Sequence, residues 1–141
     1  MTGQTGQIRA EIVVQDGGST GRGRVTLMRL TWKRDDPLAV SIVLVAVPDH
    51  PALPQGSWVM LRDFLRYGLE EPTGDGDVRL TPAPDGSTMR MELARNGRTV
   101  RVSAPTAVVR DFLDQTEKVV PTGEEAGAAE LDALIDELLR R

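Results

Sequence analysis

The sequence predicts an α+β domain made of two copies of a strand–strand–strand–helix unit. The first observation is a repeated tetrapeptide, since Arg-Asp-Phe-Leu occupies residues 62–65 and again residues 110–113. Each copy is followed at a similar distance by Pro-Thr-Gly, at 72–74 and at 121–123. The second observation is that strand and helix patterns precede both copies in the same order. A short match can arise by chance, so the shared order of elements is what favours an internal duplication.

Length and composition are those of one globular domain. A chain of 141 residues with 40% hydrophobic and 27% charged residues can build one hydrophobic core. It has no cysteine, which excludes disulfides and thiolate metal sites and fits a reducing cytoplasm. No signal peptide is recognisable, and no apolar run reaches the roughly 20 residues of a membrane helix. We predict a cytoplasmic protein with a single domain over residues 1–141 and a flexible N-terminus at 1–7.

The first half is predicted to contain three strands. Residues 8–14, 24–32 and 38–47 are apolar runs rich in β-branched side chains. The glycine-rich stretch at 17–23 lacks the Lys-Ser/Thr ending of a phosphate-binding P-loop, so we interpret it as a hairpin connection. The third run lacks clean alternation, which indicates burial on both faces, with another subunit as one way to cover the second face. The interface candidates on this strand are Leu38, Val40, Ile42 and Leu44.

A helix is predicted over residues 58–67, after a proline-rich loop at 48–56. Ser57 is a favourable N-cap, and Gly68 suits the end of a helix. We interpret Trp58 as a core anchor rather than a binding residue. The residues that form an apolar stripe at helical spacing are Trp58, Leu61, Phe64, Leu65 and Leu69.

The second half repeats this order. Strands are predicted over residues 77–81, 88–94 and 98–103, and Asn-Gly at 96–97 is a strong signal for a tight hairpin. A helix is predicted over 105–118. Alternation along these strands leaves one face of the sheet charged, and its residues are Arg79, Arg90, Glu92 and Arg101.

A last helix is predicted over residues 128–141. Its leucine-rich stripe packs on its own domain or helps to hold an oligomer or a partner. The interface candidates on this helix are Leu131, Leu134, Ile135 and Leu138.

No catalytic set is predicted from the sequence. The single histidine, His50, lies in a loop between prolines and has no second histidine with which to share a metal. Asp75 and Asp77 lack the length and spacing of a calcium loop and are interpreted as a turn that leads into a strand. No nucleophile–base pair or cofactor motif is present. We therefore expect no enzymatic activity, no metal and no cofactor.

Nucleic-acid binding is the alternative that the charged face leaves open. Arg79, Arg90 and Arg101 could contact phosphates. However, the net charge is −4, and the chain has only two tryptophans, one tyrosine and two phenylalanines. Most of these aromatic residues fall on apolar helix stripes, whereas single-strand binders stack bases on exposed aromatic side chains. A protein-binding or solvated face is favoured.

Residues 58–82 carry a specific resemblance to a known family. The pattern consists of Trp58-Val59, Arg62-Asp63, Leu65, Gly68-Leu69, Pro72, Gly74, Gly76-Asp77-Val78 and Pro82. In these positions the chain resembles the SsgA-like proteins, which are sporulation and cell-division regulators of spore-forming actinobacteria. The resemblance extends from about residue 25 to the end of the chain. It departs from the family pattern in the loops at 17–23 and 48–56.

The resemblance implies a regulator and not an enzyme. Family members help to choose and mature septum sites, and one of them positions the tubulin-like division protein FtsZ. The resemblance also implies a whirly-like fold with two antiparallel sheets, assembled as a homotrimer. We therefore expect a septum-recruited adaptor that acts through protein–protein contacts with FtsZ or the cell-wall machinery. The alternative is a single-stranded nucleic-acid-binding protein of whirly-like fold.

Overall fold

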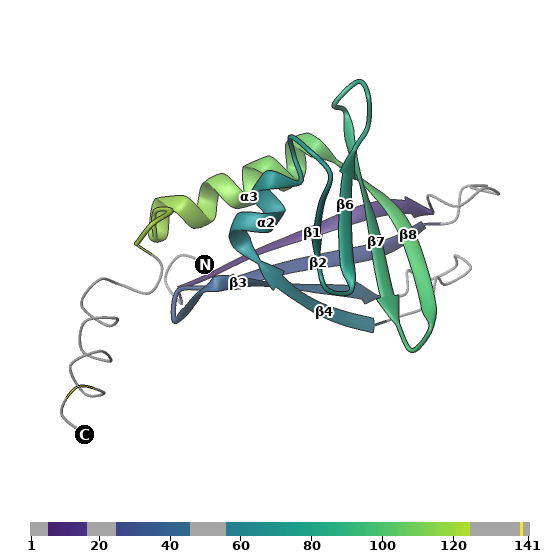
Figure 1. The fold of residues 1–141 in the computed structure, drawn as a ribbon. Helices are drawn as coiled ribbons and strands as arrows, with labels where there is room; N and C mark the ends of the chain where they lie inside the picture. The colour runs from purple at the N-terminus through teal and green to yellow at the C-terminus, as the bar shows by residue number, and fades with distance from the viewer. Residues whose placement is uncertain (1–5, 17–24, 46–55, 125–138, 140–141) are drawn as a thin grey trace.

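The computed structural model of this chain describes residues 6–16, 25–45, 56–124 and 139. Within these residues the chain forms one antiparallel sheet of eight strands, in the order β4-β3-β2-β1-β8-β7-β6-β5, with two helices (Figure 1). The first half contains β1 (Gln7–Asp16), β2 (Val25–Lys33), β3 (Asp36–Val45), β4 (Gly56–Leu61) and α2 (Arg62–Tyr67). The second half contains β5 (Thr73–Asp75), β6 (Val78–Pro82), β7 (Thr88–Arg95), β8 (Arg98–Pro105) and α3 (Thr106–Val119).

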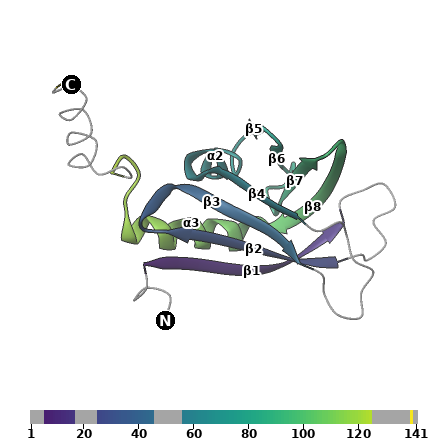
Figure 2. The same cartoon turned by 90° about the horizontal axis from the view of Figure 1, so that it is seen from below.

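The two halves of the sheet are joined at one corner. β1 and β8 pair only at Gln15–Ser103 and Asp16–Val102. From this corner β1 to β4 form one layer and β6 to β8 run across it, while α2 and α3 fill the angle between them (Figures 1 and 2). The α+β class is confirmed. The prediction of two sheets is wrong, because the pairing of β1 with β8 joins all eight strands into one sheet. The whirly-like duplication stays a prediction.

Each half runs four strands and then a helix, one strand more than we predicted. The fourth strand of the first half is β4, in a segment that we had predicted as helix. Trp58 and Met60 point into the core, whereas Val59 and Leu61 are exposed, and this alternation is that of a strand. Because Trp58, Leu61 and Leu65 also fit a helical period, the two patterns competed over this segment. Residues 56–61 form a strand because they hydrogen-bond to β3, and α2 begins only at Arg62.

The third strand alternates like an ordinary half-covered strand. Val40, Ile42 and Leu44 are buried, and Ser41 and Val43 between them are partly exposed. One face of this strand is therefore buried within the chain, and burial of its other face by another subunit stays a prediction. The apolar residues at the outward positions hid the alternation in the sequence.

The second half agrees with the predictions in all but its first strand. The hairpin at 96–97 is confirmed, with φ of 53° at Asn96 and 78° at Gly97. α3 lies where a helix was predicted, although Val108 on its predicted core side is 38% exposed. β5 was not predicted, because its three residues, Thr-Gly-Asp, carry no strand pattern.

One hydrophobic core fills the angle between the two halves. The inward side chains of both sheet layers meet Leu65 of α2 and the buried face of α3. The largest fully buried side chains include Trp32, Phe112, Met28, Leu30, Ile42, Met60, Leu80 and Met91.

Gly68 closes α2 against β6, and its lack of a side chain is what allows the contact. Its φ of −64° is ordinary for any residue, so backbone strain is not the reason for glycine. A Cβ atom at this position would stand 2.4 Å from Cδ1 and 2.7 Å from Cβ of Leu80. The Cδ1 atom could swing away, but the Cβ atom is fixed to the backbone of β6.

Gly68→Ala is therefore expected to lower the free energy of unfolding by about 1–3 kcal/mol, the usual cost of overpacking. Alanine favours a helix over glycine, so a loss would have to come from the clash. Urea denaturation followed by circular dichroism measures it. Gly74→Ala is the control, because a Cβ there meets nothing closer than 3.9 Å. Equal stability of the two variants would contradict the close approach.

Several predicted segments lie outside the described residues. These are residues 1–5, the loops at 17–24 and 46–55, and most of the predicted helix at 128–141. β1 already begins at Gln7, so the predicted flexible N-terminus is shorter by at least that residue. None of the described helices is long and apolar enough to cross a membrane.

Candidate protein-binding surfaces

The face of β1 to β4 that points away from the helices carries several exposed apolar side chains among polar ones. Val59 is 67% exposed, Val13 is 60% exposed and Leu61 is 41% exposed. In the register Val13, Leu27 and Val45 form one row across β1, β2 and β3. Val59 lies opposite Ser41, and Leu61 lies opposite Ala39. We call this surface the apolar outer face, and define it by Val13, Leu27, Val43, Val45, Val59 and Leu61.

One ion pair interrupts the apolar outer face. The Nε and Nη2 groups of Arg29 both donate hydrogen bonds to Oε2 of Glu11, at 3.0 Å and 2.9 Å. The two residues face each other across β1 and β2. Their charges satisfy each other, whereas Arg9 and Lys33 are further cations at outward positions of β1 and β2.

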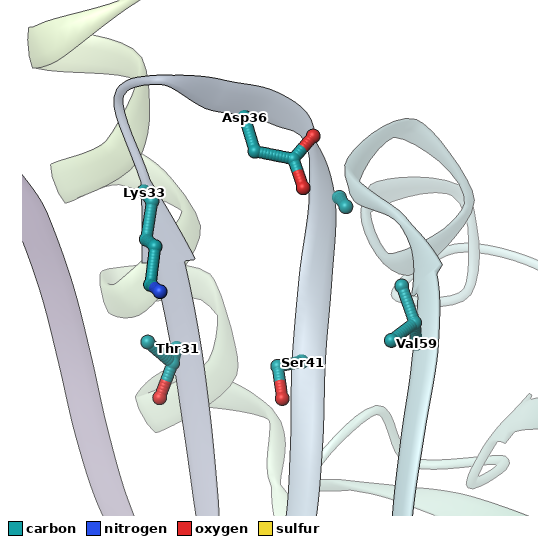
Figure 3. A pocket seen from close by; sticks show the side chains of 6 residues that line it. Thr31, Lys33, Asp36, Ser41 and Val59 are labelled. Carbon is teal, nitrogen blue, oxygen red and sulfur yellow. The ribbon is translucent and has the colours of Figure 1, made fainter.

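A shallow depression of about 150 Å³ lies at one end of this face (Figure 3). Lys33 and Asp36 lie at its β2–β3 end, while Thr31, Ser41 and Val59 line its other part (Figure 3). A hollow of this size suits one side chain of a partner and is too small for most cofactors.

The interface residues that we predicted lie elsewhere. Val40 and Ile42 have no exposed surface and Leu44 is 2% exposed, so these three side chains belong to the core of this chain. Leu38, at 46% exposure, is on the surface. The candidates Leu131, Leu134, Ile135 and Leu138 lie outside the described residues, and their interface role stays a prediction.

The second surface is the outward side of β6, β7 and β8. Alternation places Arg79, Arg90 and Arg101 there, as predicted, and all three are exposed. Glu92 pairs with Arg79 and with Arg101 in the strand register, and its Oε2 lies 3.6 Å from Nε of Arg101. We call this surface the arginine face and define it by Arg79, Arg90, Glu92 and Arg101.

Between α2 and α3 lies a group of polar contacts that the sequence did not predict. Arg62 is 2% exposed, its guanidinium lies 5.5 Å from the ring centroid of Trp32, and its Nη1 donates to Oγ1 of Thr116 at 3.2 Å. Arg66 makes ion pairs with Glu117 and, at 3.1 Å, with Asp114.

Glu117 is the titratable group of this contact whose pKa is shifted. The hydroxyl of Thr122 donates to its carboxylate at 2.8 Å, and Arg66 adds a hydrogen bond and a favourable charge. These contacts outweigh desolvation and lower the pKa of Glu117 below its usual value. The contribution of Glu117 to stability is therefore present at neutral pH and is lost as the pH falls through this lowered value.

Neither surface resembles an active site. Oδ2 of Asp75 accepts a hydrogen bond from the backbone N–H of Leu61 at 2.9 Å, and Gly76 takes the turn with φ of 61°, so the turn interpretation is confirmed. Among the described residues no group of three or more acidic or histidine side chains could hold a metal ion. His50 lies outside the described residues.

Sequence reasoning missed the apolar outer face, although the signal was present. Had residues 56–61 been interpreted as a strand, Trp58 and Met60 inward would have placed Val59 and Leu61 outward. The burial of Arg62 had no such signal, because its tetrapeptide recurs at Arg110, which is exposed.

Comparisons with known proteins agree with this architecture. The family model described as Streptomyces sporulation and cell division protein, SsgA, matches residues 26–125. A sporulation-specific cell division protein SsgB from Thermobifida fusca is 31% identical over 98% of this chain and 96% of its own length. One from Kineococcus radiotolerans is 32% identical over 86% of this chain and 73% of its own length.

Solved structures of sporulation-specific cell division proteins also superpose on this chain. The crystal structure of an SsgA-like sporulation-specific cell division protein from Thermobifida fusca superposes with a TM-score of 0.76 at 29% identity, over 94% of this chain and 96% of that one. A structure from work on SsgB mutations and longitudinal cell division in Streptomyces coelicolor superposes with a TM-score of 0.73 at 27% identity, over 84% of this chain and 92% of that one. The chain belongs to the SsgA family of sporulation and cell division proteins.

Proposed function

We propose that this protein is a non-enzymatic adaptor of sporulation-specific cell division that acts through protein–protein contacts. Its role would be the choice or maturation of septum sites, with FtsZ or the cell-wall machinery as partners and recruitment from the cytoplasm to the septum. The observation that carries the proposal is the apolar outer face, on a chain whose relatives are sporulation-specific cell division proteins.

The apolar outer face supports contact with another protein for a physical reason. Its sheet already has the other side covered by α2, α3 and the core, so these outward side chains add nothing to the core of the monomer. Monomeric proteins rarely expose contiguous apolar patches, and such patches mark interaction sites. Each square ångström of apolar surface that a partner covers stabilises the complex by about 25 cal/mol before the costs of association.

The proposal includes that the protein forms a homo-oligomer, a trimer. The apolar outer face and any surface formed by residues 128–141 are the regions that would meet in it. The depression beside Val59 offers a place for one side chain of the neighbouring copy.

Val59→Asp is expected to break these contacts while the monomer stays folded. The side chain is 67% exposed on an edge strand, so the substitution should cost no more than about 1 kcal/mol of stability. A carboxylate in the middle of an apolar contact would lose its water without gaining a partner. Size exclusion with light scattering, with and without purified FtsZ, should show loss of the oligomer or of the complex.

Val108→Asp is the matched control, because Val108 is an exposed valine of α3 outside both the apolar outer face and the arginine face. This variant should have the same oligomeric mass as the wild type, and it should elute with FtsZ to the same extent. A wild-type protein that is monomeric and does not bind FtsZ would contradict both the proposed oligomer and the proposed FtsZ complex. A folded Val59→Asp variant that behaves as wild type would show that they use another surface.

Single-strand nucleic-acid binding is the second candidate, and the exposed arginines of the arginine face are the observation that favours it. It predicts that a labelled oligonucleotide binds in a salt-sensitive way and is released by Arg90→Ala or Arg101→Ala. No aromatic side chain lies on the described part of this face, which counts against stacking of bases.

A further inference from the structure

We propose that the arginine face binds an acidic segment of a partner protein, with Arg90 at the centre of the contact. This inference goes beyond the proposed function, because it concerns a different surface from the apolar outer face and names the chemistry of what binds there.

Arg90 lies in a polar, hydrogen-bonding environment on the open side of β7. In the register Thr81 of β6 stands opposite it on one side and Ser103 of β8 on the other. All three residues lie at outward positions, where Arg90 and Thr81 are exposed and Ser103 is half-buried. Neighbouring strands are about 4.8 Å apart, so both hydroxyls can reach a group that the guanidinium holds.

Two further arginines are diagonal neighbours of Arg90. Arg79 and Arg101 flank Glu92, which follows Arg90 by two residues on the same face of β7. Diagonal neighbours are about 7–8 Å apart, within the reach of long side chains. Three arginines therefore stand at outward positions within two residue spacings along β7.

These cations are not neutralised by the described part of the chain. Neither Arg79 nor Arg90 makes an ion pair there, and Arg101 keeps only the 3.6 Å approach to Glu92. Further carboxylates lie at the two ends of β6, Asp77 in the turn before it and Asp85 in the turn after it. The face thus carries a positive charge on a chain whose net charge is −4.

A hollow of about 410 Å³ lies next to Arg79. Thr73, Gly74, Gly76 and Thr81 are among the residues that line it. Gly74 faces Arg79 across β5 and β6, and its missing side chain leaves the space open. Side chains of a bound segment can enter here while its carboxylates reach the arginines.

The chemistry favours protein carboxylates over nucleic acid. Arginine pairs with carboxylates through two parallel hydrogen bonds, and charge-assisted bonds of this kind are about twice as strong as neutral ones. Single-strand binders add aromatic stacking platforms, whereas both tryptophans and Phe112 are buried in the core on the other side of the sheet. Arginine and hydroxyl groups without an aromatic neighbour suit an Asp- or Glu-rich segment.

The test is fluorescence anisotropy with the whole protein and a labelled peptide of alternating Glu and Ser, about 8 residues long, which spans about 27 Å when extended. We expect saturable binding that weakens with salt. Arg90→Gln should weaken it by about 10-fold or more, the loss of one charge-assisted contact. Arg9→Gln, an exposed arginine on β1, is the matched control and should bind as the wild type does.

Gly74→Val is a second variant that leaves every charge in place. A Cβ atom there would meet only ordinary contacts at 3.9 Å, so we expect the variant to fold, to fill part of the hollow and to weaken binding several-fold. Absence of peptide binding by the wild type would overturn the proposal, as would equal losses in Arg90→Gln and Arg9→Gln. Tighter binding of a thymidine oligonucleotide with as many charges would overturn it in favour of nucleic acid. Failure here leaves the oligomer and FtsZ outcomes of Val59→Asp unaffected, so the two proposals fail separately.

Discussion

Arg62→Ala is expected to lower the free energy of unfolding by about 2–4 kcal/mol, whereas Arg110→Ala should change it by no more than about 0.5 kcal/mol. Both residues are the first of an Arg-Asp-Phe-Leu tetrapeptide, so the chain itself supplies a matched pair. The three residues that follow each arginine are identical, whereas the surroundings of the two arginines in the fold differ.

The difference follows from the contacts of each guanidinium. Arg62 is almost completely buried, between the ring of Trp32 on β2 and the hydroxyl of Thr116 on α3. Truncation would remove a cation–π contact worth about 1–2 kcal/mol and leave a cavity between α2 and α3. Arg110 is half-exposed, and its Nη2 is 3.9 Å from Oε1 of Glu70, a surface pair of little energetic value.

Urea denaturation followed by circular dichroism measures both variants. Arg62→Met separates packing from charge, because methionine refills much of the space without a cation. It should recover part of the loss. A Met variant as stable as the wild type would mean that desolvation cancels the charged contacts, as happens in other buried ion sites. Equal losses in Arg62→Ala and Arg110→Ala would contradict the assignment of different surroundings.

The same pair shows where sequence reasoning stops. The tetrapeptide predicted two helices, and both exist, but the first copy opens the short α2 while the second lies inside the longer α3. Position along the helix decides which side chains turn inward. Because this position depends on packing against the other half, Arg62 could not be distinguished from Arg110 before the fold was known.

Local patterns predicted the second half better than the first. The Asn96–Gly97 turn and the alternation of β7 and β8 are local signals, so the arginine face could be predicted from them. The apolar outer face was missed, because several of its outward positions carry valine and leucine as the inward positions do. An apolar outward face removes the contrast on which alternation depends, and this is why β3 looked buried on both sides and β4 looked helical.

Trp58→Ala is expected to be the most destabilising substitution considered, at about 3–5 kcal/mol. Trp58 is 7% exposed on β4, and its Nε1 donates to the carbonyl oxygen of Ala94 on β7 at 2.9 Å. The guanidinium of Arg95 lies 5.8 Å from the ring centroid. The indole therefore joins the two halves of the sheet at a place where β4 and β7 share no strand pairing.

Removal of the indole acts on this junction in two ways. It creates a large cavity, and it removes a hydrogen bond to a partly buried carbonyl, which is worth about 0.5–1.5 kcal/mol. Trp58→Phe keeps much of the apolar surface but loses the donor and part of the ring volume, so it should cost about 1–3 kcal/mol. For a domain with a typical stability of about 5–15 kcal/mol, Trp58→Ala would remove a large share of the total.

Thermal denaturation by calorimetry measures the series. At about 2–6 °C of Tm per kcal/mol for a chain of this size, Trp58→Ala should lower Tm by about 10 °C or more. Tyr67→Ala, which removes an aromatic side chain that is 49% exposed on the neighbouring α2, is the control and should lower it only slightly. If Trp58→Ala behaved like Tyr67→Ala, the indole would not hold the halves together. The corner between β1 and β8, with its two residue pairs, would then have to hold the angle of the sheet with the core alone.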